Sequence, residues 1–135
     1  GSRIPFPHRD YRVIRSLDVL AALYSSASVG VAFSTTNPSR VPFEMMACGC
    51  PVVDLDYGDN YINYGSRDNV MLVEPIPESI AEGIELLIRN EELRSKIARN
   101  GFDFARSLPS EEEEARRMES LILKEFQGQL NQRRG

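Results

Sequence analysis

The chain has 135 residues, a net charge of −4 at neutral pH, and apolar and charged fractions of 41% and 27%, as in ordinary globular proteins. This length suffices for one domain whose core needs no disulfide or metal for stability. The mild acidity gives no indication of a nucleic-acid binder, which usually shows a basic face, and the apolar runs are too short to span a bilayer.

The start of the sequence shows no secretory signal, because no charged segment is followed by an apolar one. The first two residues have the composition of a cloning remnant, and residues 1–10 as a whole are expected to form an irregular arm. Tyr11–Ile14 is expected to form a short strand. Ser16 or Asp18 is then placed to cap a helix with apolar residues at helical spacing, namely Leu17, Leu20, Ala21, Tyr24 and Ala27.

The middle of the chain alternates short apolar runs with polar loops. Val29–Phe33 is apolar throughout, which is typical of a strand buried on both faces of a parallel sheet. After the polar loop, Pro42 suits the first turn of a helix and Gly49 supplies its left-handed stop. Two further buried strands are expected at Pro51–Leu55 and Val70–Val73.

The rest of the chain is predicted to be helical. Helices are expected at Pro77–Asn90 and Glu91–Arg106, and a third at Ser110–Phe126, where Ser110 and Glu113 form a capping-box signature. Strands alternating with helices predict an α/β fold, a Rossmann-like parallel sheet with flanking helices. Because so few strands are expected, residues 11–127 are interpreted as part of a domain, followed by a polar tail at 128–135.

The two cysteines are Cys48 and Cys50, and their close spacing disfavours a disulfide. The single histidine, His8, leaves too few ligands for a structural zinc site and is interpreted as a surface residue of the arm. We therefore expect no metal site, two small, buried free thiols and a cytoplasmic location, with membrane association only through the full-length protein.

Polar residues gather after Val29–Phe33, and in parallel sheets ligands bind outside the carboxyl ends of the strands. The loop from Ser34 to Val41 also enters a helix N-terminus, where unpaired amides and the helix dipole favour a phosphate. Donors and a positive charge come from Thr35, Thr36, Asn37, Ser39 and Arg40. This loop could hold a diphosphate without a metal.

Glu44 lies in the first turn of the helix that follows this loop. A carboxylate there is favourable to the helix dipole and needs no further role. An ionised carboxylate also accepts hydrogen bonds from two neighbouring hydroxyls, as in a ribose. From the residues alone, both interpretations of Glu44 stay open.

A second polar loop follows the strand Pro51–Leu55 and contains Tyr57, Tyr61 and Tyr64. This loop could close over a bound sugar, with Asp59 or Asn60 contacting its hydroxyls. A solvated crossover between strands explains the same composition, because surface loops are generally polar. Both interpretations of this loop stay open.

The run Pro42–Val53 resembles the signature P-x-E-A-M-A-C-G-x-P-V-V of GT-B glycosyltransferases of the family 4-like group 1. Its flanks agree. Leu20–Ser34 looks like the family's L-A-x-L-Y-x-x-A-D-V-x-V-x-P-S pair of helix and strand, and Asn69–Pro75 like its N-G-x-L-V-x-P strand. The helix at Pro77–Ile88 follows as in the family, and the similarity extends from about Tyr11 to Phe126. The chain is therefore similar to the C-terminal, donor-binding domain of these enzymes.

The resemblance implies site residues. Glu44 would bind the ribose hydroxyls of the donor nucleotide, and the backbone at Ile14 and Arg15 would meet the base. The diphosphate and sugar would be lined by Ser34, Thr36, Asn37, Ser39, Arg40 and Val41. The resemblance gives no catalytic residue.

The family's second glutamate, eight residues before Glu44, is replaced here by Thr36. The run Thr36–Pro42 instead resembles the P-S-x-x-P-x-E-M variant of rhamnan-synthesis-type rhamnosyltransferases. This variant favours a deoxysugar such as rhamnose on a dTDP carrier over the usual glucose- or mannose-type donors.

The implied function is transfer of a sugar from a nucleotide-diphosphate donor to a glycan acceptor, without metal or cofactor and with retention of anomeric configuration. The acceptor domain and a basic Arg/Lys pair are expected upstream, so this fragment alone is expected to be inactive. The apolar stripe of Ser110–Phe126 would then contact that domain or a second copy in a homodimer. The alternative is a non-catalytic nucleotide-sugar-binding or interaction module. An oxidoreductase is disfavoured because no Gly-x-Gly-x-x-Gly run follows a strand.

Overall fold

The computed structural model describes residues 4–35 and 39–134, with side chains to residue 129. The chain divides into two units, Gly1–Ala105 and Arg106–Gly135. In chain order the elements are α1 (Leu17–Ser26), β1 (Gly30–Val31), α2 (Val41–Ala47), β2 (Val52–Leu55), α3 (Asn60–Asn63), β3 (Met71–Val73), α4 (Pro77–Arg89), α5 (Glu91–Ser107) and α6 (Glu111–Arg134).

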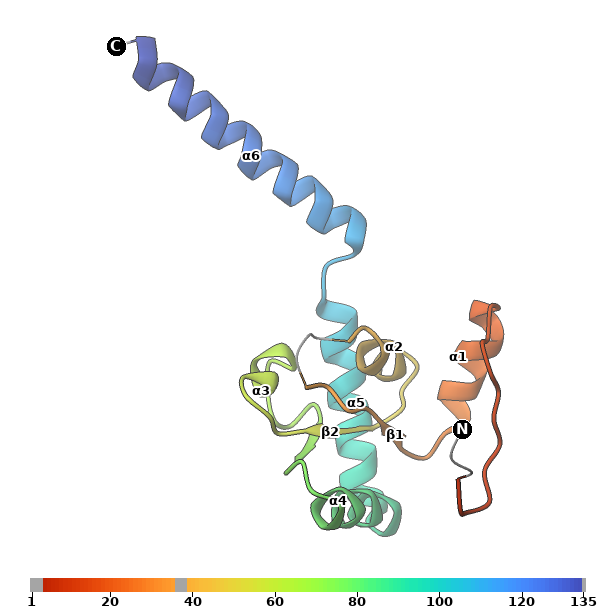
Figure 1. The fold of residues 1–135 in the computed structure, drawn as a ribbon. Helices are drawn as coiled ribbons and strands as arrows, with labels where there is room; N and C mark the ends of the chain where they lie inside the picture. The colour runs from red at the N-terminus through yellow and green to blue at the C-terminus, as the bar shows by residue number, and fades with distance from the viewer. Residues whose placement is uncertain (1–3, 36–38, 135) are drawn as a thin grey trace. The chain divides into compact units, whose positions relative to one another are not determined.

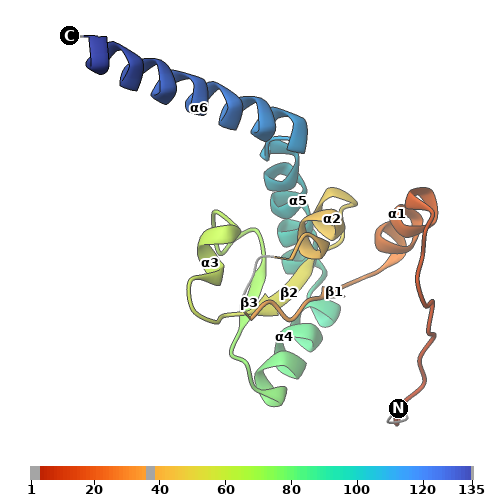
Figure 2. The ribbon, with the colours of Figure 1, turned by 45° about the horizontal axis from the view of Figure 1, so that its top comes forward.

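The first unit is built on a parallel sheet with strand order β1-β2-β3 (Figure 1). Gly30 is in register with Val52, and Val53 with Met71. Viewed along the sheet, α2 and α4 lie on opposite faces (Figure 2). This arrangement confirms the predicted α/β fold with a Rossmann-like parallel sheet and flanking helices.

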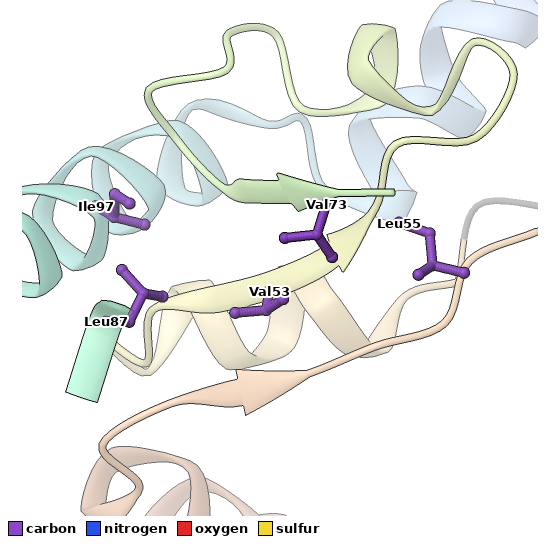
Figure 3. Close-up of a cluster of buried hydrophobic side chains, with 5 residues drawn as sticks. All are labelled: Val53, Leu55, Val73, Leu87 and Ile97. Atoms are coloured by element: carbon purple, nitrogen blue, oxygen red, sulfur yellow. The ribbon is translucent and has the colours of Figure 1, made fainter. Parts of the chain in front are cut away.

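Alternation along β2 divides the core into two clusters, because successive side chains of a strand point to opposite faces. On one face, Val53 and Leu55 pack with side chains from β3, α4 and α5, namely Val73, Leu87 and Ile97 (Figure 3). On the other face, Val52 packs with Met46, Tyr64 and Val70. Every residue of β2 is buried, so this strand is the centre of the first unit.

The predicted helix signals of the site region are confirmed. Pro42 lies in the first turn of α2, and Gly49 after its end adopts a φ of 75°, the left-handed conformation that stops the helix. The strands predicted at Pro51–Leu55 and Val70–Val73 are also confirmed, as β2 and β3. The strand predicted at Val29–Phe33 is shorter than expected, and Phe33 is 63% exposed because it lies beyond the paired residues of β1.

The strand predicted at Tyr11–Ile14 is wrong. Arg12 adopts a φ of 54°, which interrupts an extended backbone, and its amide donates to the Asp10 carboxylate at 2.8 Å. Val13, expected to be an apolar strand residue, is 82% exposed. The helix predicted next is confirmed as α1, with the amide of Val19 donating to the Ser16 hydroxyl at 3.4 Å.

The second unit consists mainly of α6. The predicted capping box is present at its start: the Glu113 amide donates to the Ser110 hydroxyl at 3.1 Å, and the Ser110 amide donates to the Glu113 carboxylate at 2.7 Å. The helix continues beyond the expected Phe126 to Arg134, through the polar residues at the end of the chain. Within the described ranges, no helix is long and apolar enough to cross a membrane.

Candidate functional site

The polar loops predicted to hold a ligand follow β1 and β2, whose carboxyl ends meet at one edge of the parallel sheet. The loop after β1 begins at Ala32 and leads into α2. The loop after β2 contains α3, a short helix that sequence patterns did not predict. These two loops form the candidate site, here called the carboxyl-edge loops.

Asp54 lies beneath both loops and is fully buried, at 0% exposure. Its Oδ1 accepts hydrogen bonds from the backbone amides of Ser34 at 2.8 Å and Leu55 at 2.7 Å. Its Oδ2 accepts from the Asn60 side-chain amide at 3.4 Å and from the Tyr64 hydroxyl. One carboxylate therefore joins the start of the first loop to two residues of the second.

The hydrogen bonds determine the charge state of Asp54. Burial raises the pKa of this carboxyl, but the bonds from the Ser34 amide, the Tyr64 hydroxyl and the Leu55 amide outweigh it and leave the pKa below its ordinary value. The pKa of Tyr64 is raised, first by burial and then by its hydrogen bond to Asp54. At neutral pH an ionised Asp54 therefore accepts from a protonated Tyr64.

The predicted phosphate-binding residues follow Ser34 along the first loop. Ser34 is 8% exposed, and the predicted residues Thr36 and Asn37 lie outside the described residues. The hydroxyl of Ser39 accepts from the amide of Val41 at 3.3 Å, and the following residue is a proline without an amide hydrogen. The first two amides of α2 are therefore unavailable to a phosphate.

Arg40 occupies the N-cap position of α2 and is exposed. Ser39 and Val41 are its neighbours along the chain, and Ser34 lies on the other side of residues 36–38, outside the described residues. The guanidinium of Arg40 adds a positive charge to this segment, where the helix amides at Val41 and the next position are unavailable.

Glu44 lies in the first turn of α2 and is exposed. Its backbone amide donates to the Arg40 carbonyl at 3.0 Å and its carbonyl accepts from the Cys48 amide at 3.2 Å, whereas within the described residues its carboxylate has no hydrogen-bond partner. The pKa of Tyr24 on α1 is raised, first by burial and then by the charge of Glu44. The carboxylate therefore lies near α1, exposed and able to accept hydrogen bonds from a ligand.

The predicted base-contacting residues lie elsewhere. Ile14 and Arg15 belong to the irregular stretch before α1, which lies on the side of α1 away from α2 in both views (Figures 1 and 2). Ser39–Val41 and Glu44 lie together at the start of α2, Ser34 is joined to Asp54 of β2, and the stretch before α1 has no described contact with them. The role of Ile14 and Arg15 stays a prediction.

The second loop is exposed at most positions, as a solvated crossover would be, but two of its polar side chains are buried. Asn60 is buried, and its side-chain amide also donates to the Leu55 carbonyl at 2.7 Å, so this amide points into the protein and not toward a sugar. Tyr64 is buried as well, whereas Tyr57 and Tyr61 are exposed. The guanidinium of Arg67 lies 5.3 Å from the centroid of the Tyr61 ring.

Asp54 was missed as a functional residue from the sequence. The available signal was an acidic residue within the otherwise apolar run Val52–Leu55. A buried carboxylate requires hydrogen-bond partners, and that requirement could have directed attention to the polar residues of the neighbouring loops.

The two cysteines lie at the far end of α2. Both are free thiols, as predicted, with Cys48 partly buried and Cys50 buried. Burial, and secondarily the nearby Cys48, raises the pKa of Cys50 to about 11. In the part of the chain that the structure describes, no group of three or more histidine, cysteine or acidic residues is arranged to hold a metal ion.

The chain is similar to a known protein family, to a known protein and to a solved structure. The family model of the WsaF C-terminal domain matches residues 11–85, more than half of the chain. The O-antigen biosynthesis protein RfbC of Myxococcus xanthus is 33% identical over 102 residues, which cover 75% of this chain and 8% of RfbC. The sucrose-phosphate synthase of Thermosynechococcus elongatus matches with a TM-score of 0.69 and 25% identity, over 82% of this chain and 28% of that chain. The chain thus spans a small part of each of these longer proteins.

Proposed function

Because the chain belongs to the WsaF C-terminal domain family and is the C-terminal domain of a GT-B glycosyltransferase, we propose that it binds the nucleotide-diphosphate sugar donor at its carboxyl-edge loops. The name of RfbC, an O-antigen biosynthesis protein, supports a reaction that builds a polysaccharide. The glycan acceptor would then bind to another part of the full-length protein.

The main observation in support of this proposal is the exposure of the Glu44 carboxylate. Its carboxylate is exposed and has no partner among the described residues, although it lies beside a polar loop at the ligand-binding edge of the sheet. A carboxylate in this state can accept both hydroxyls of a ribose. A purely structural carboxylate in a first helical turn would need no such neighbouring loop.

The donor diphosphate would rest on the first loop. With two of the first amides of α2 unavailable, the charge of Arg40 and the amides and hydroxyls of Ser34–Ser39 would hold the phosphate oxygens. Fixed donors and charges aimed at the leaving diphosphate stabilise it as charge develops. On this basis we infer metal-independent transfer with no cofactor, and retention of configuration as in the enzymes that the sequence resembles.

The donor sugar is the finer part of the proposal. Thr36 stands where the related glycosyltransferases commonly have a glutamate that contacts the sugar, so a sugar with fewer hydroxyl contacts fits better. We therefore propose a deoxysugar, with dTDP-rhamnose as the first compound to test. Synthesis of such donors in the cytoplasm would place the reaction there.

The proposal is tested by titrating the 135-residue chain with dTDP, UDP, dTDP-rhamnose and UDP-glucose, using calorimetry. Glu44→Gln should weaken nucleotide binding by about tenfold or more, because hydrogen bonds to a charged group contribute roughly 1.5–3 kcal/mol. Glu78→Gln is the matched control, since Glu78 is an exposed first-turn acid of α4 that also follows a proline. Absence of saturable binding, or equal losses in both variants, would contradict the donor site.

A second candidate is a non-catalytic nucleotide-sugar-binding module with the same fold, which the threonine at position 36 favours. The two functions differ in the full-length protein. Binding of donor together with transfer to a glycan supports the enzyme, whereas binding without transfer by the full-length protein supports the module.

A further inference from the structure

The carboxyl-edge loops need something to fix them, because they lie outside the regular pairing of the sheet. The last sheet bond on the β1 side is donated by the amide of Ala32 to the carbonyl of Val53, at 2.9 Å. Two residues later, the amide of Ser34 leaves the ladder and donates to the Asp54 side chain instead. The path of the first loop therefore begins at a side-chain contact.

A carboxylate at position 54 is energetically unfavourable. Its neighbours Val52, Val53 and Leu55 are apolar and buried, and an apolar side chain there would avoid the desolvation of a buried charge, which costs several kcal/mol. The charge is compensated by four donors, two on each oxygen. Stability of β2 alone gives no reason for this choice.

The two carboxylate oxygens of Asp54 bind different loops. Oδ1 binds the amide at the start of the loop that leads to Arg40 and α2, while Oδ2 binds Asn60 and Tyr64 of the loop after β2. The Ser34 side chain also interacts with both Asp54 and Tyr64, so the two loops meet around this carboxylate. A shift of this single carboxylate would therefore displace both loops.

We propose that Asp54 is a positioning residue of the donor site, which holds Ser34 and the segment 60–64 in the arrangement that receives the nucleotide. This inference rests on the proposed function, because it assigns Asp54 a role in the binding carried out by the loops above it. Because Asp54 itself is fully buried, it would act through the residues that it binds.

The test measures loop position and binding separately in the 135-residue chain. Amide hydrogen exchange followed by NMR reports Ser34, which depends on Asp54, and Ala32, which depends only on the sheet. Calorimetry with dTDP reports binding. The variants are Asp54→Ala, Asp54→Asn and the control Glu85→Gln, an exposed acid of α4 that pairs with Arg89 outside both loops.

In Asp54→Ala, exchange at Ser34 should accelerate by about tenfold or more while Ala32 stays protected, since a lost bond to a charged group corresponds to this change. Affinity for dTDP should fall by about tenfold. Asp54→Asn keeps an acceptor for the Ser34 amide, so it should restore both values to within about threefold of wild type. The control should change neither. Asp54→Val, which suits a buried strand, replaces the alanine variant if that variant does not fold.

Three results would overturn the proposal, and they are distinguishable. If Ser34 stays protected in Asp54→Ala, Asp54 does not hold the loop. If Ser34 and Ala32 lose protection together and Asp54→Asn does not restore binding, the role of Asp54 is general stability. If wild-type chain binds no nucleotide, the proposed function fails, and the positioning role fails with it whatever Ser34 shows.

Discussion

The close packing of α4 on the sheet predicts that Gly83→Ala destabilises the first unit. Gly83 is buried in α4, and a Cβ at this position would lie 2.5 Å from Cγ1 of Val73 on β3. Ordinary carbon–carbon contacts are near 3.5–4.0 Å. Val73 is β-branched and buried, so it has few alternative rotamers, and the helix would have to move away from the sheet.

Two effects of this substitution oppose each other. Alanine in a helix interior is favoured over glycine by about 1 kcal/mol. Forcing an extra methyl group into a packed core costs roughly 1–3 kcal/mol, and the upper part of this range applies when backbone must shift. The expected net loss in the free energy of unfolding is therefore about 2 kcal/mol.

Urea unfolding of the two single variants, Gly83→Ala and Val73→Ala, and of the double variant tests this reasoning. Since Val73→Ala removes the clashing methyl group, its cost should be at least about 1 kcal/mol smaller in the Gly83→Ala background. The matched control is Gly128→Ala in α6, where a Cβ would meet nothing within 4 Å and helix content should rise. If the losses in the free energy of unfolding are additive, or if Gly83→Ala is more stable than wild type, the reasoning from close packing is refuted.

Three further predictions concern the charge of Asp54, the thiol of Cys50 and the N-cap of α6. Because folding lowers the pKa of Asp54, its charge should stabilise the fold at neutral pH, and this contribution should be lost as pH falls below about 4 through the folded-state pKa. The free energies of unfolding of wild type and Asp54→Asn in urea should therefore converge at low pH. A difference that stays constant with pH would contradict the direction of the pKa shift. Native Cys50, with its pKa raised to about 11, should react with iodoacetamide at pH 8 at least about tenfold more slowly than Cys48; equal rates by mass spectrometry would count against its burial. Ser110→Ala should reduce the helicity of α6 with a cost of about 1 kcal/mol, measured by circular dichroism, and an unchanged spectrum would argue against the cap.

Local signals in the sequence predicted most of the fold. Pro42 and Gly49 marked the limits of α2, and Ser110 with Glu113 marked the start of α6, because each acts through backbone geometry within a few residues. The buried strands β2 and β3 were evident from apolar runs. These features depend on neighbours along the chain, which a sequence shows directly.

The prediction of a strand at Tyr11–Ile14 was wrong because a strand depends on residues that are distant along the chain. Its apolar residues Val13 and Ile14 suit a strand, but a strand requires pairing partners, and here a local bond between the Arg12 amide and Asp10 accompanies a left-handed turn. Such competition between a side-chain bond and extended backbone is decided by tertiary context.

The candidate site was predicted in part. Glu44 and the Ser34 loop were found from the motif and from the rule for parallel sheets, and the structure joins them in one segment. Asp54 was not found because its partners lie 20 residues before it and 6 and 10 residues after it. Only the folded chain shows that these donors converge on one buried carboxylate.

The central claim is that the carboxyl-edge loops and Glu44 bind a nucleotide-diphosphate sugar. The most direct measurement is an NMR titration of the 15N-labelled chain with dTDP-rhamnose. The account predicts saturable shifts of the backbone amides of Ser34, Ser39, Val41 and Glu44, with little change at Leu87 and Ile97 in the core (Figure 3). Shifts confined to other surfaces, or no saturable shift at these loops with any nucleotide sugar tested, would contradict it.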